Sequence, residues 1–240
     1  MTRATRRKAG KGQSTPNERA FRQAISRWYK QDGRRYPWRL PSASLYVQIV
    51  SEVLLQRTRA DAVEKFFPQF LDEFPSWSIL SNASVIRIGQ VLKPVGLWRR
   101  RARSLKSLAL RMSRRRGRFP AERFEIDSLP GVGQYIGNAI ELFAHGRARP
   151  LLDSGMARVL ERYFGPRQLV DIRYDPYLQD LAQRVVADKD CKTLNWAILD
   201  LSALVCTREP LCETCPLSAG CMHATEDLRS RRQTGVGFKN

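Results

Sequence analysis

The chain has 240 residues, enough for one large hydrophobic core or two smaller ones. It carries 42 Lys and Arg against 23 Asp and Glu, and the formal net charge of +19 favours a polyanionic partner such as nucleic acid. A non-catalytic basic protein of the ribosomal kind shares this balance and stays an alternative. No apolar run reaches the roughly 18 residues of a membrane span, and the N-terminus lacks the apolar segment of a signal peptide, so we expect neither a membrane nor a secreted protein.

Apolar residues recur at helical spacing through most of the chain, and no segment indicates a strand. Residues 1–14 are polar and basic, and we expect a disordered basic arm there. The run Thr15-Pro16-Asn17-Glu18 is typical of a capping box that begins a helix, and Gly33 is expected to end that helix. Further helices are expected over Tyr46–Thr58, around Val63–Phe74 with Pro68 as a late start or kink, around Val85–Leu92 and Leu105–Met112, and at 134–145, 155–164, 176–187 and 193–205.

Residues 99–118 contain ten Lys or Arg and almost no acid. Most of these cations are expected on one end and one face of a helix. A merely solvated surface is the alternative, but the lack of balancing acids favours a contact with the DNA backbone. Arg99, Arg100 and Arg101 are the candidate phosphate ligands.

The chain turns at Leu129-Pro130-Gly131-Val132-Gly133, immediately before a predicted helix that begins at Gln134. Glycines in such a turn allow close approach, and the free N–H groups at the helix N-terminus suit a phosphate. A dinucleotide fingerprint is disfavoured because the glycines follow G-x-G-x-x-x-G and no buried strand precedes them. A purely structural helical corner is the other alternative. The candidate DNA contacts are Leu129, Gly131, Val132, Gly133 and Gln134.

Four of the five cysteines lie near the C-terminus in the spacing Cys206-x5-Cys212-x2-Cys215-x5-Cys221. No cysteine precedes Cys191, so the layout indicates a metal site in a reducing compartment rather than a disulfide framework. Zinc sites usually pair two C-x2-C knuckles, whereas single thiolates can bind the corners of a 4Fe–4S cube. The spacing therefore favours a 4Fe–4S cluster over zinc, with Cys191 as an ordinary half-buried thiol. Two histidines in the chain disfavour a His-based triad.

Several motifs together resemble the helix-hairpin-helix DNA glycosylases of the endonuclease III superfamily, and among them the adenine and thymine mismatch enzymes. They are SEVLLQRT (Ser51–Thr58), LPGVGQY, LLDSGMARVLERYFG (Leu151–Gly165), LDLSALVC and CETCPLSAGC, and the resemblance covers roughly residues 16–222. The first cysteine gap is five residues, where the family usually has six.

The resemblance implies an all-α, two-lobed fold that binds DNA in a cleft and flips the target base into it. Residues 37–147 would form a six-helix barrel with the hairpin. Residues 15–36 and 148–225 would form a helical lobe with the cluster loop, and 226–240 a flexible tail. Double-stranded DNA with a mismatched or damaged base is the implied partner. We also expect a monomer in the cytoplasm of a prokaryote.

The family's catalytic residues map onto three positions. Asp153 matches the catalytic Asp, whose carboxylate stabilises an oxocarbenium-like sugar and can activate water, and it can also cap a helix. Glu52 aligns with the pocket glutamate, for which a surface glutamate is the structural alternative. Tyr135 stands where bifunctional members have a Schiff-base lysine, so we expect a monofunctional enzyme. Gln56 and Arg57 match the wedge that fills the gap left by the flipped base.

Two features bear on the substrate that the resemblance implies. Tyr135 resembles the thymine/uracil mismatch enzymes, and the chain ends nineteen residues after Cys221, without the domain that reads oxidised guanine in adenine glycosylases. We therefore expect removal of T or U opposite G, with adenine opposite G or oxidised G as the alternative. A cluster-bearing DNA-binding protein without turnover is a third reading. Gly155 replaces a family Asn that helps to order the site, which puts the rate or substrate in doubt.

Overall fold

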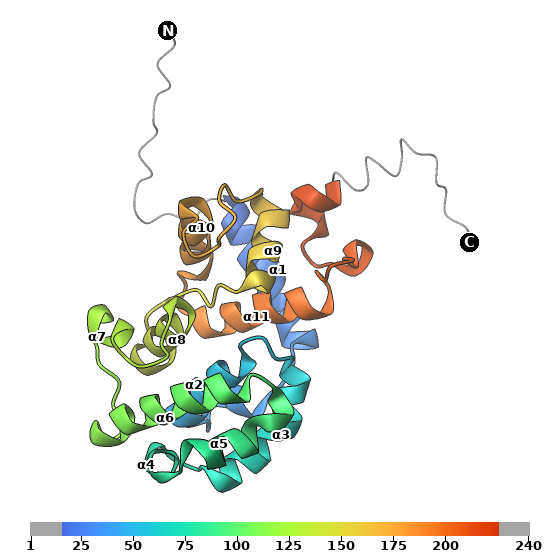
Figure 1. Ribbon diagram of the computed structural model, residues 1–240. Coiled ribbons are helices and arrows are strands. Elements are labelled where there is room, and N and C mark those ends of the chain that lie inside the picture. The colour runs from blue at the N-terminus through green and yellow to red at the C-terminus, as the bar shows by residue number, and fades with distance from the viewer. Residues whose placement is uncertain (1–15, 226–240) are drawn as a thin grey trace. The chain divides into compact units, whose positions relative to one another are not determined.

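The computed structural model describes residues 16–225, and every regular element in that range is a helix (Figure 1). The all-α fold class expected from the sequence is thereby confirmed. The predicted basic arm, Thr15 of the predicted capping box and the predicted tail after residue 225 lie outside the described residues. Within residues 16–225, no helix is both long enough and apolar enough to cross a membrane.

Contacts divide the chain into two compact units. Unit one contains the residues through Gly33, then Ser154–Asp188 and the chain from Thr193 onward; unit two contains Arg34–Asp153 and Lys189–Lys192. The sequence analysis placed residues 34–36, 148–153 and 189–192 in the other lobe, so the two divisions differ in these three segments. The physical reason at the second boundary is that Asn138 donates a hydrogen bond to the Pro150 carbonyl (2.9 Å), which holds the segment before Asp153 on unit two.

Unit two is built around a long helix that packs against two shorter ones, α6 against α4 and α5. Side chains at the starts of three helices fix where those helices begin, because Ser44, Ser76 and Ser84 each accept a hydrogen bond from a backbone N–H three residues on. The helices are α2 (Leu45–Leu55), α3 (Ala60–Glu73), α4 (Trp77–Asn82), α5 (Val85–Leu92), α6 (Trp98–Arg114), α7 (Arg123–Asp127) and α8 (Gln134–His145), with 3-10 turns η1 (Pro37–Arg39) and η2 (Lys93–Val95).

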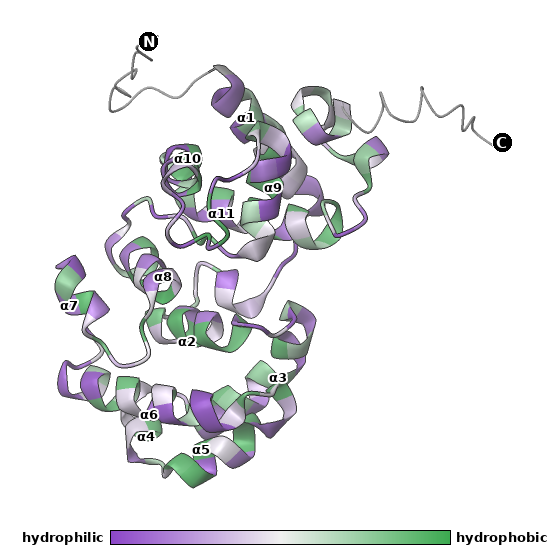
Figure 2. Ribbon diagram, turned by 45° about the horizontal axis from the view of Figure 1, so that its top comes forward, coloured by the Kyte–Doolittle hydropathy of each residue, from purple (hydrophilic) through white to green (hydrophobic). Residues whose placement is uncertain are grey.

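Helices α3, α5 and α6 of unit two each carry a hydrophobic and a hydrophilic side, which Figure 2 shows as mixed colours along them. The buried apolar residues of α6 recur at helical spacing, from Ala102 to Leu105, Leu108, Ala109 and Met112. Burial of this stripe against α4 and α5 is the main force that fixes α6, because propensity alone rarely stabilises a helix in water.

Unit one combines the first described helix with the later ones. Phe21 of α1 packs edge-on against Tyr163 with ring centroids 5.0 Å apart, and Glu18 accepts a hydrogen bond from Arg184 at 2.8 Å. Asp175 caps α10 by accepting from the Leu178 N–H. The elements are α1 (Pro16–Asp32), α9 (Ser154–Phe164), α10 (Pro176–Val186), most of α11 (Cys191–Leu204), η3 (Cys212–Thr214) and η4 (Ser218–Gly220).

The predicted helices are all present, with small shifts at their ends. The second predicted helix ends at Leu55 rather than Thr58, because Arg57 takes a left-handed backbone with φ 57°. Pro68 lies inside α3 and does not mark a late start. The sequence analysis missed α4 and α7, which are too short to show a clear helical period.

Candidate active site and DNA-facing surface

A buried carboxylate on α2 meets a phenol on α8 inside unit two. The Tyr135 hydroxyl donates a hydrogen bond to Glu52 Oε2 at 2.8 Å, although the two residues are 83 positions apart. Glu52 is only 3% exposed, so the alternative of a surface glutamate is wrong. Helices α2 and α8 pack against each other, which brings the two side chains together.

The pKa of Glu52 is raised to about 7 because burial disfavours its charged form. The hydrogen bond from Tyr135 and the positive charge of Arg39 lower that pKa, while the negative charge of Asp153 raises it. The pKa of Tyr135 is well above its usual value, first through burial and then through the charges of Glu52 and Asp153. Glu52, Tyr135, Asp153 and Arg39 therefore form one electrostatically coupled group, which we call the carboxylate site.

Arg39 is the member of the carboxylate site that the sequence analysis missed. It lies in η1, which Trp38 anchors because that indole is almost fully buried and stacks on Tyr36 with ring centroids 4.6 Å apart. The Arg39 guanidinium lies over the Tyr36 ring at 5.0 Å. The signal is present in the sequence as the run Pro37-Trp38-Arg39, for which the sequence analysis predicts neither a helical turn nor a site residue.

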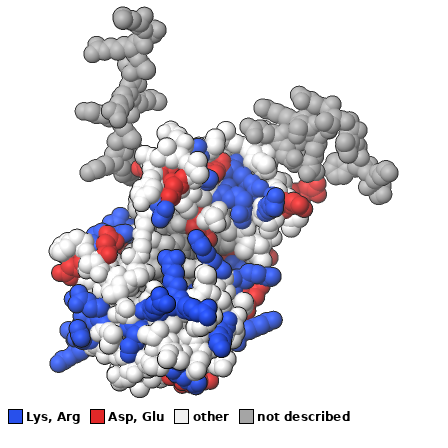
Figure 3. Space-filling model, in the orientation of Figure 1, with Lys and Arg blue, Asp and Glu red and all other residues white. Residues whose placement is uncertain are grey.

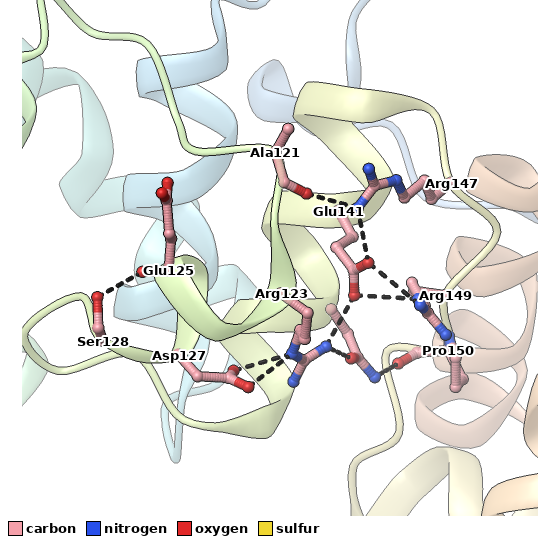
Figure 4. A network of polar contacts seen from close by, with 10 residues as sticks. Ala121, Arg123, Glu125, Asp127, Ser128, Glu141, Arg147, Arg149 and Pro150 are labelled. Atoms are coloured by element: carbon pink, nitrogen blue, oxygen red, sulfur yellow. Dashed lines mark hydrogen bonds and ion pairs between the residues drawn. The ribbon is translucent and has the colours of Figure 1, made fainter.

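A polar network supports the segment that leads to Asp153 (Figure 4). Glu141 of α8 is fully buried and pairs with Arg123 at 2.8 Å, Arg147 at 3.2 Å and Arg149 at 3.0 Å. Burial alone would raise the pKa of Glu141, but the hydrogen bonds from these arginines lower it below its usual value. The network ties α7, α8 and residues 147–149 together, so the chain approaches Asp153 on a fixed path.

The predicted hairpin is formed by α7, a tight turn and α8. Gly131 has φ +75°, and a Cβ there would lie 2.9 Å from the Cβ of Ser104 on α6, so the turn needs glycine on both counts. Gly131, Gly133 and Gln134 are exposed and Val132 is half-buried. The closeness of Gly131 to Ser104 places the hairpin turn beside α6.

Leu129 and Arg101, two of the predicted DNA contacts, belong to the interior of unit two. Leu129 is 5% exposed, so its side chain is part of the core and cannot reach DNA. Arg101 is also 5% exposed, because its guanidinium points inward to backbone carbonyls. Lys106 of the same basic stretch likewise donates to the carbonyls of Ser81 and Ala83. The predicted DNA contacts of Leu129 and Arg101 are therefore wrong, and Lys106 is a further cation of residues 99–118 that points inward.

Arg99 and Arg100 are exposed in the first turn of α6, as predicted, and Gln56 and Arg57 are exposed in the turn after α2. Figure 3 shows Lys and Arg side chains gathered over the part of unit two that α6 occupies in Figure 1. With the hairpin turn next to Ser104, these residues form a basic face of unit two, which can bind an anionic backbone.

In unit one, the four predicted ligands Cys206, Cys212, Cys215 and Cys221 line a single cavity. The pKa of the Cys215 thiol is raised to about 11, chiefly by burial and in part by Cys206, Cys221 and Cys212, while a backbone hydrogen bond from Leu217 lowers it. Four thiolates in such a place need a cationic group to neutralise them, and this donor set fits an iron–sulfur cluster. Among the described residues, no three His, Cys, Asp or Glu side chains are arranged for one metal ion.

The cysteine cavity is held by arginine contacts with the backbone. Arg162 donates to the carbonyls of Thr207 (2.6 Å) and Arg208 (3.0 Å) and to Cys206 Sγ (3.3 Å). Cys191 is not a lining residue; it lies at the start of α11 and is buried rather than half-buried.

An all-helical fold with a hairpin turn beside a buried carboxylate site is the arrangement expected of a helix-hairpin-helix protein. A family model described as "HhH-GPD superfamily base excision DNA repair protein" matches residues 50–171. The chain is similar to a thymine-DNA glycosylase of Aeropyrum pernix, with 35% identity over 87% of this chain and 96% of the relative. It is also similar to a thymine/uracil-DNA glycosylase of Pyrobaculum aerophilum, with 36% identity over 82% of this chain and 88% of the relative.

The fold agrees with this likeness in sequence. The solved structure of a thermostable thymine-DNA glycosylase superposes with a TM-score of 0.79 at 31% identity, over 88% of this chain and 97% of that one. The chain belongs to the HhH-GPD superfamily of base excision DNA repair proteins.

The raised pKa of Glu52 predicts a pH-dependent cost in stability. Because the folded-state pKa lies above that of the unfolded chain, the free energy of unfolding falls as the pH rises from about 4.5 to about 7 and stays low above that. Glu52→Gln removes the cost, so the variant should exceed the wild type by about 3 kcal/mol at pH 8 and by much less at pH 5. Urea unfolding at both pH values measures this difference.

The exposed Glu122 provides a matched control, since Glu122→Gln removes a carboxylate that is already in water. It should change stability little at either pH. An equal gain from Glu52→Gln at pH 5 and pH 8 would mean that the Glu52 carboxyl does not titrate in this range.

Proposed function

We propose that this protein is a monofunctional DNA glycosylase that hydrolyses the N-glycosidic bond of T or U mispaired with G. The observation that carries the proposal is the hydrogen bond between Tyr135 and Glu52, which lie close enough to Asp153 for its charge to raise the pKa of Glu52. The similarity to thymine and thymine/uracil glycosylases over most of the chain supports the same substrate class.

In this mechanism Asp153 acts on the sugar. As the bond between C1′ and the base nitrogen breaks, its electron pair leaves with the base, and the sugar becomes an oxocarbenium-like cation. The Asp153 carboxylate stabilises that charge and accepts a proton from the water whose oxygen attacks C1′. Asp153 then gives up that proton and the base anion gains one, so the products are the free base and an intact abasic strand.

Glu52 and Tyr135 act on the base rather than on the sugar. Because the pKa of Tyr135 is raised, the phenol keeps its proton and continues to donate to Glu52. A phenol cannot form the imine through which a lysine cleaves the strand, so β-lyase chemistry is not expected. Glu52 has further acceptor capacity with which to hold the N–H of a flipped pyrimidine.

A second function is favoured by the raised pKa of Glu52. A carboxyl with a pKa of about 7 is partly protonated near neutral pH and can give that proton to a departing purine. This property fits an adenine glycosylase acting on A opposite G or oxidised G, and the substrate assay below separates the two functions.

Duplex DNA is the partner that fits the basic face of unit two. The hairpin turn offers the N–H groups at the start of α8, and Arg99 and Arg100 lie exposed at the start of α6 beside it. Gln56 and Arg57, in the turn after α2, would fill the gap that the flipped base leaves and meet the base opposite.

We also propose that Cys206, Cys212, Cys215 and Cys221 hold a 4Fe–4S cluster. The cluster would neutralise four thiolates, of which Cys206 is buried and the other three half-buried, and would fix the fold of the segment after α11. No step of base removal requires it.

The substrate assay incubates the protein with G·T, G·U, G·A and oxidised-G·A duplexes in single turnover, with and without hot alkali. We expect release of T or U and strand breaks only after alkali. Asp153→Asn should lower the rate by ~100-fold or more at unchanged DNA affinity, because the lost charge acts mainly in the transition state. Adenine release without pyrimidine release would favour the second function, and no release from any duplex would favour a DNA-binding protein without turnover.

The basic face predicts a specific dependence on salt. Arg99→Ala together with Arg100→Ala should weaken binding to all duplexes alike and flatten the slope of log K against log salt by up to ~2 units. Arg87→Ala is the control, because Arg87 is paired with Glu73 at 2.7 Å and should leave the slope unchanged. Equal slopes for the double variant and the wild type would show that α6 does not face DNA.

The cluster proposal predicts brown protein after anaerobic purification, with absorbance near ~410 nm that is typical of thiolate-ligated iron–sulfur groups. Cys215→Ser should lose the colour, and Cys191→Ser should keep it because Cys191 does not line the cavity. Colourless protein with one stoichiometric zinc ion would contradict the cluster.

A further inference from the structure

Three non-glycine residues of unit two have left-handed backbone conformations, Arg57, Leu97 and Arg116, and the turns at Arg57 and Leu97 share their contacts. Arg57 has φ 57° in the turn after α2, and Leu97 has φ 49° in the turn before α6, directly after Gly96 at φ 70°. Arg57 and Leu97 are also exposed, so their own side chains do not anchor these turns in the core. Such conformations persist only where surrounding contacts hold them.

The contacts that hold both turns come from one buried guanidinium. Arg101 Nη1 donates to the carbonyls of Val95 (2.6 Å) and Gly96 (2.8 Å). Its Nη2 donates to the Gln56 carbonyl and to Thr58 Oγ1. The turn of residues 56–58 and the turn of residues 95–97 are therefore connected through a single side chain.

Thr58 completes this arrangement. Its hydroxyl accepts from Arg101 at 2.7 Å and donates to the Val95 carbonyl at 3.2 Å. A planar guanidinium presents its donors as a wide fork on separate nitrogen atoms, whereas a lysine offers its three donors from a single nitrogen. The four acceptors lie on two separate turns, so their relative position depends on the Arg101 side chain.

We propose that Arg101 is a positioning residue that sets Gln56 and Arg57 for contact with the base opposite the target. This inference rests on the proposed function. Arg101 itself is buried and does not touch DNA. It acts through the Gln56 carbonyl and the Thr58 hydroxyl, which border the left-handed Arg57, and so through the direction in which the Gln56 and Arg57 side chains leave the turn.

Lys106 offers a matched comparison on the same helix. It too points inward and donates to two backbone carbonyls, those of Ser81 and Ala83, but these lie at the end of α4 and not in the turn of residues 56–58. Loss of Lys106 therefore removes a comparable structural contact without touching that turn.

The test measures binding and base flipping on DNA that cannot be cleaved. Duplexes carry 2′-fluorothymidine opposite G or opposite A, with 2-aminopurine next to it, whose fluorescence rises when its neighbour leaves the stack. The wild type should prefer the duplex with G and raise the fluorescence. Arg101→Met should reduce both the preference and the rise by about tenfold, the size expected from losing hydrogen bonds to a charged group.

The remaining variants separate positioning from stability. Lys106→Met should lower the melting temperature while keeping the preference for G and the fluorescence rise. Arg101→Lys should regain part of both signals, because one ammonium can serve only some of the acceptors. If Arg101→Met does not fold, Thr58→Val, which keeps the side-chain volume, should still reduce the preference for G by several-fold.

Two results would overturn the inference. One is an Arg101→Met or Thr58→Val protein that keeps the wild-type preference and fluorescence, or loses them no more than Lys106→Met does. The other is a wild type that shows no preference for the base opposite. A wild type that flips and discriminates on these duplexes, but releases no base from unmodified ones, contradicts the proposed function and leaves the inference about Arg101 intact.

Discussion

The hydrogen bond from Tyr135 to Glu52 is the contact on which the rest of the carboxylate site depends. It joins α2 and α8, and it gives a nearly buried carboxylate one of the partners that burial demands. It also forces the Tyr135 hydroxyl to donate, so the phenol faces the carboxylate rather than reaching for a sugar. In the proposed function, this arrangement leaves the site to hold a base and to support hydrolysis by water, without covalent attack by a side chain.

The two buried carboxylates of unit two have opposite pKa shifts because their partners differ. Glu141 has three arginine partners, and its pKa is lowered, so it remains charged and stabilises the path toward Asp153. Glu52 lacks comparable compensation and its pKa is raised to about 7. A carboxylate that is costly to ionise is typical of a functional site, because stability alone would favour a neutral group there.

Much of this architecture follows from the sequence, since the apolar period of the long helices and the turn at Gly131 are local signals. The pairing of Glu52 with Tyr135 could be anticipated only through the resemblance to a family, because no local pattern relates residues so far apart. The sequence did not predict Arg39, because its place in the carboxylate site comes from the fold of η1 and not from the spacing of residues. The sequence did not predict the short helices α4 and α7, because five or six residues cannot show a helical period of 3.6.

The net charge of +19 overstates the charge that the surface offers to DNA, because some of the Lys and Arg side chains bind other parts of the protein. Backbone carbonyls within the units accept hydrogen bonds from Arg101, Lys106 and Arg162. Glu141 forms ion pairs with three further arginines. A sequence counts these charges but gives no direction for their side chains. What remains for DNA is the smaller set exposed on the basic face, next to the hairpin turn. Under the proposed role of Arg101, the same basic composition would serve two purposes, because an inward arginine would set the turn from which outward side chains would meet the duplex.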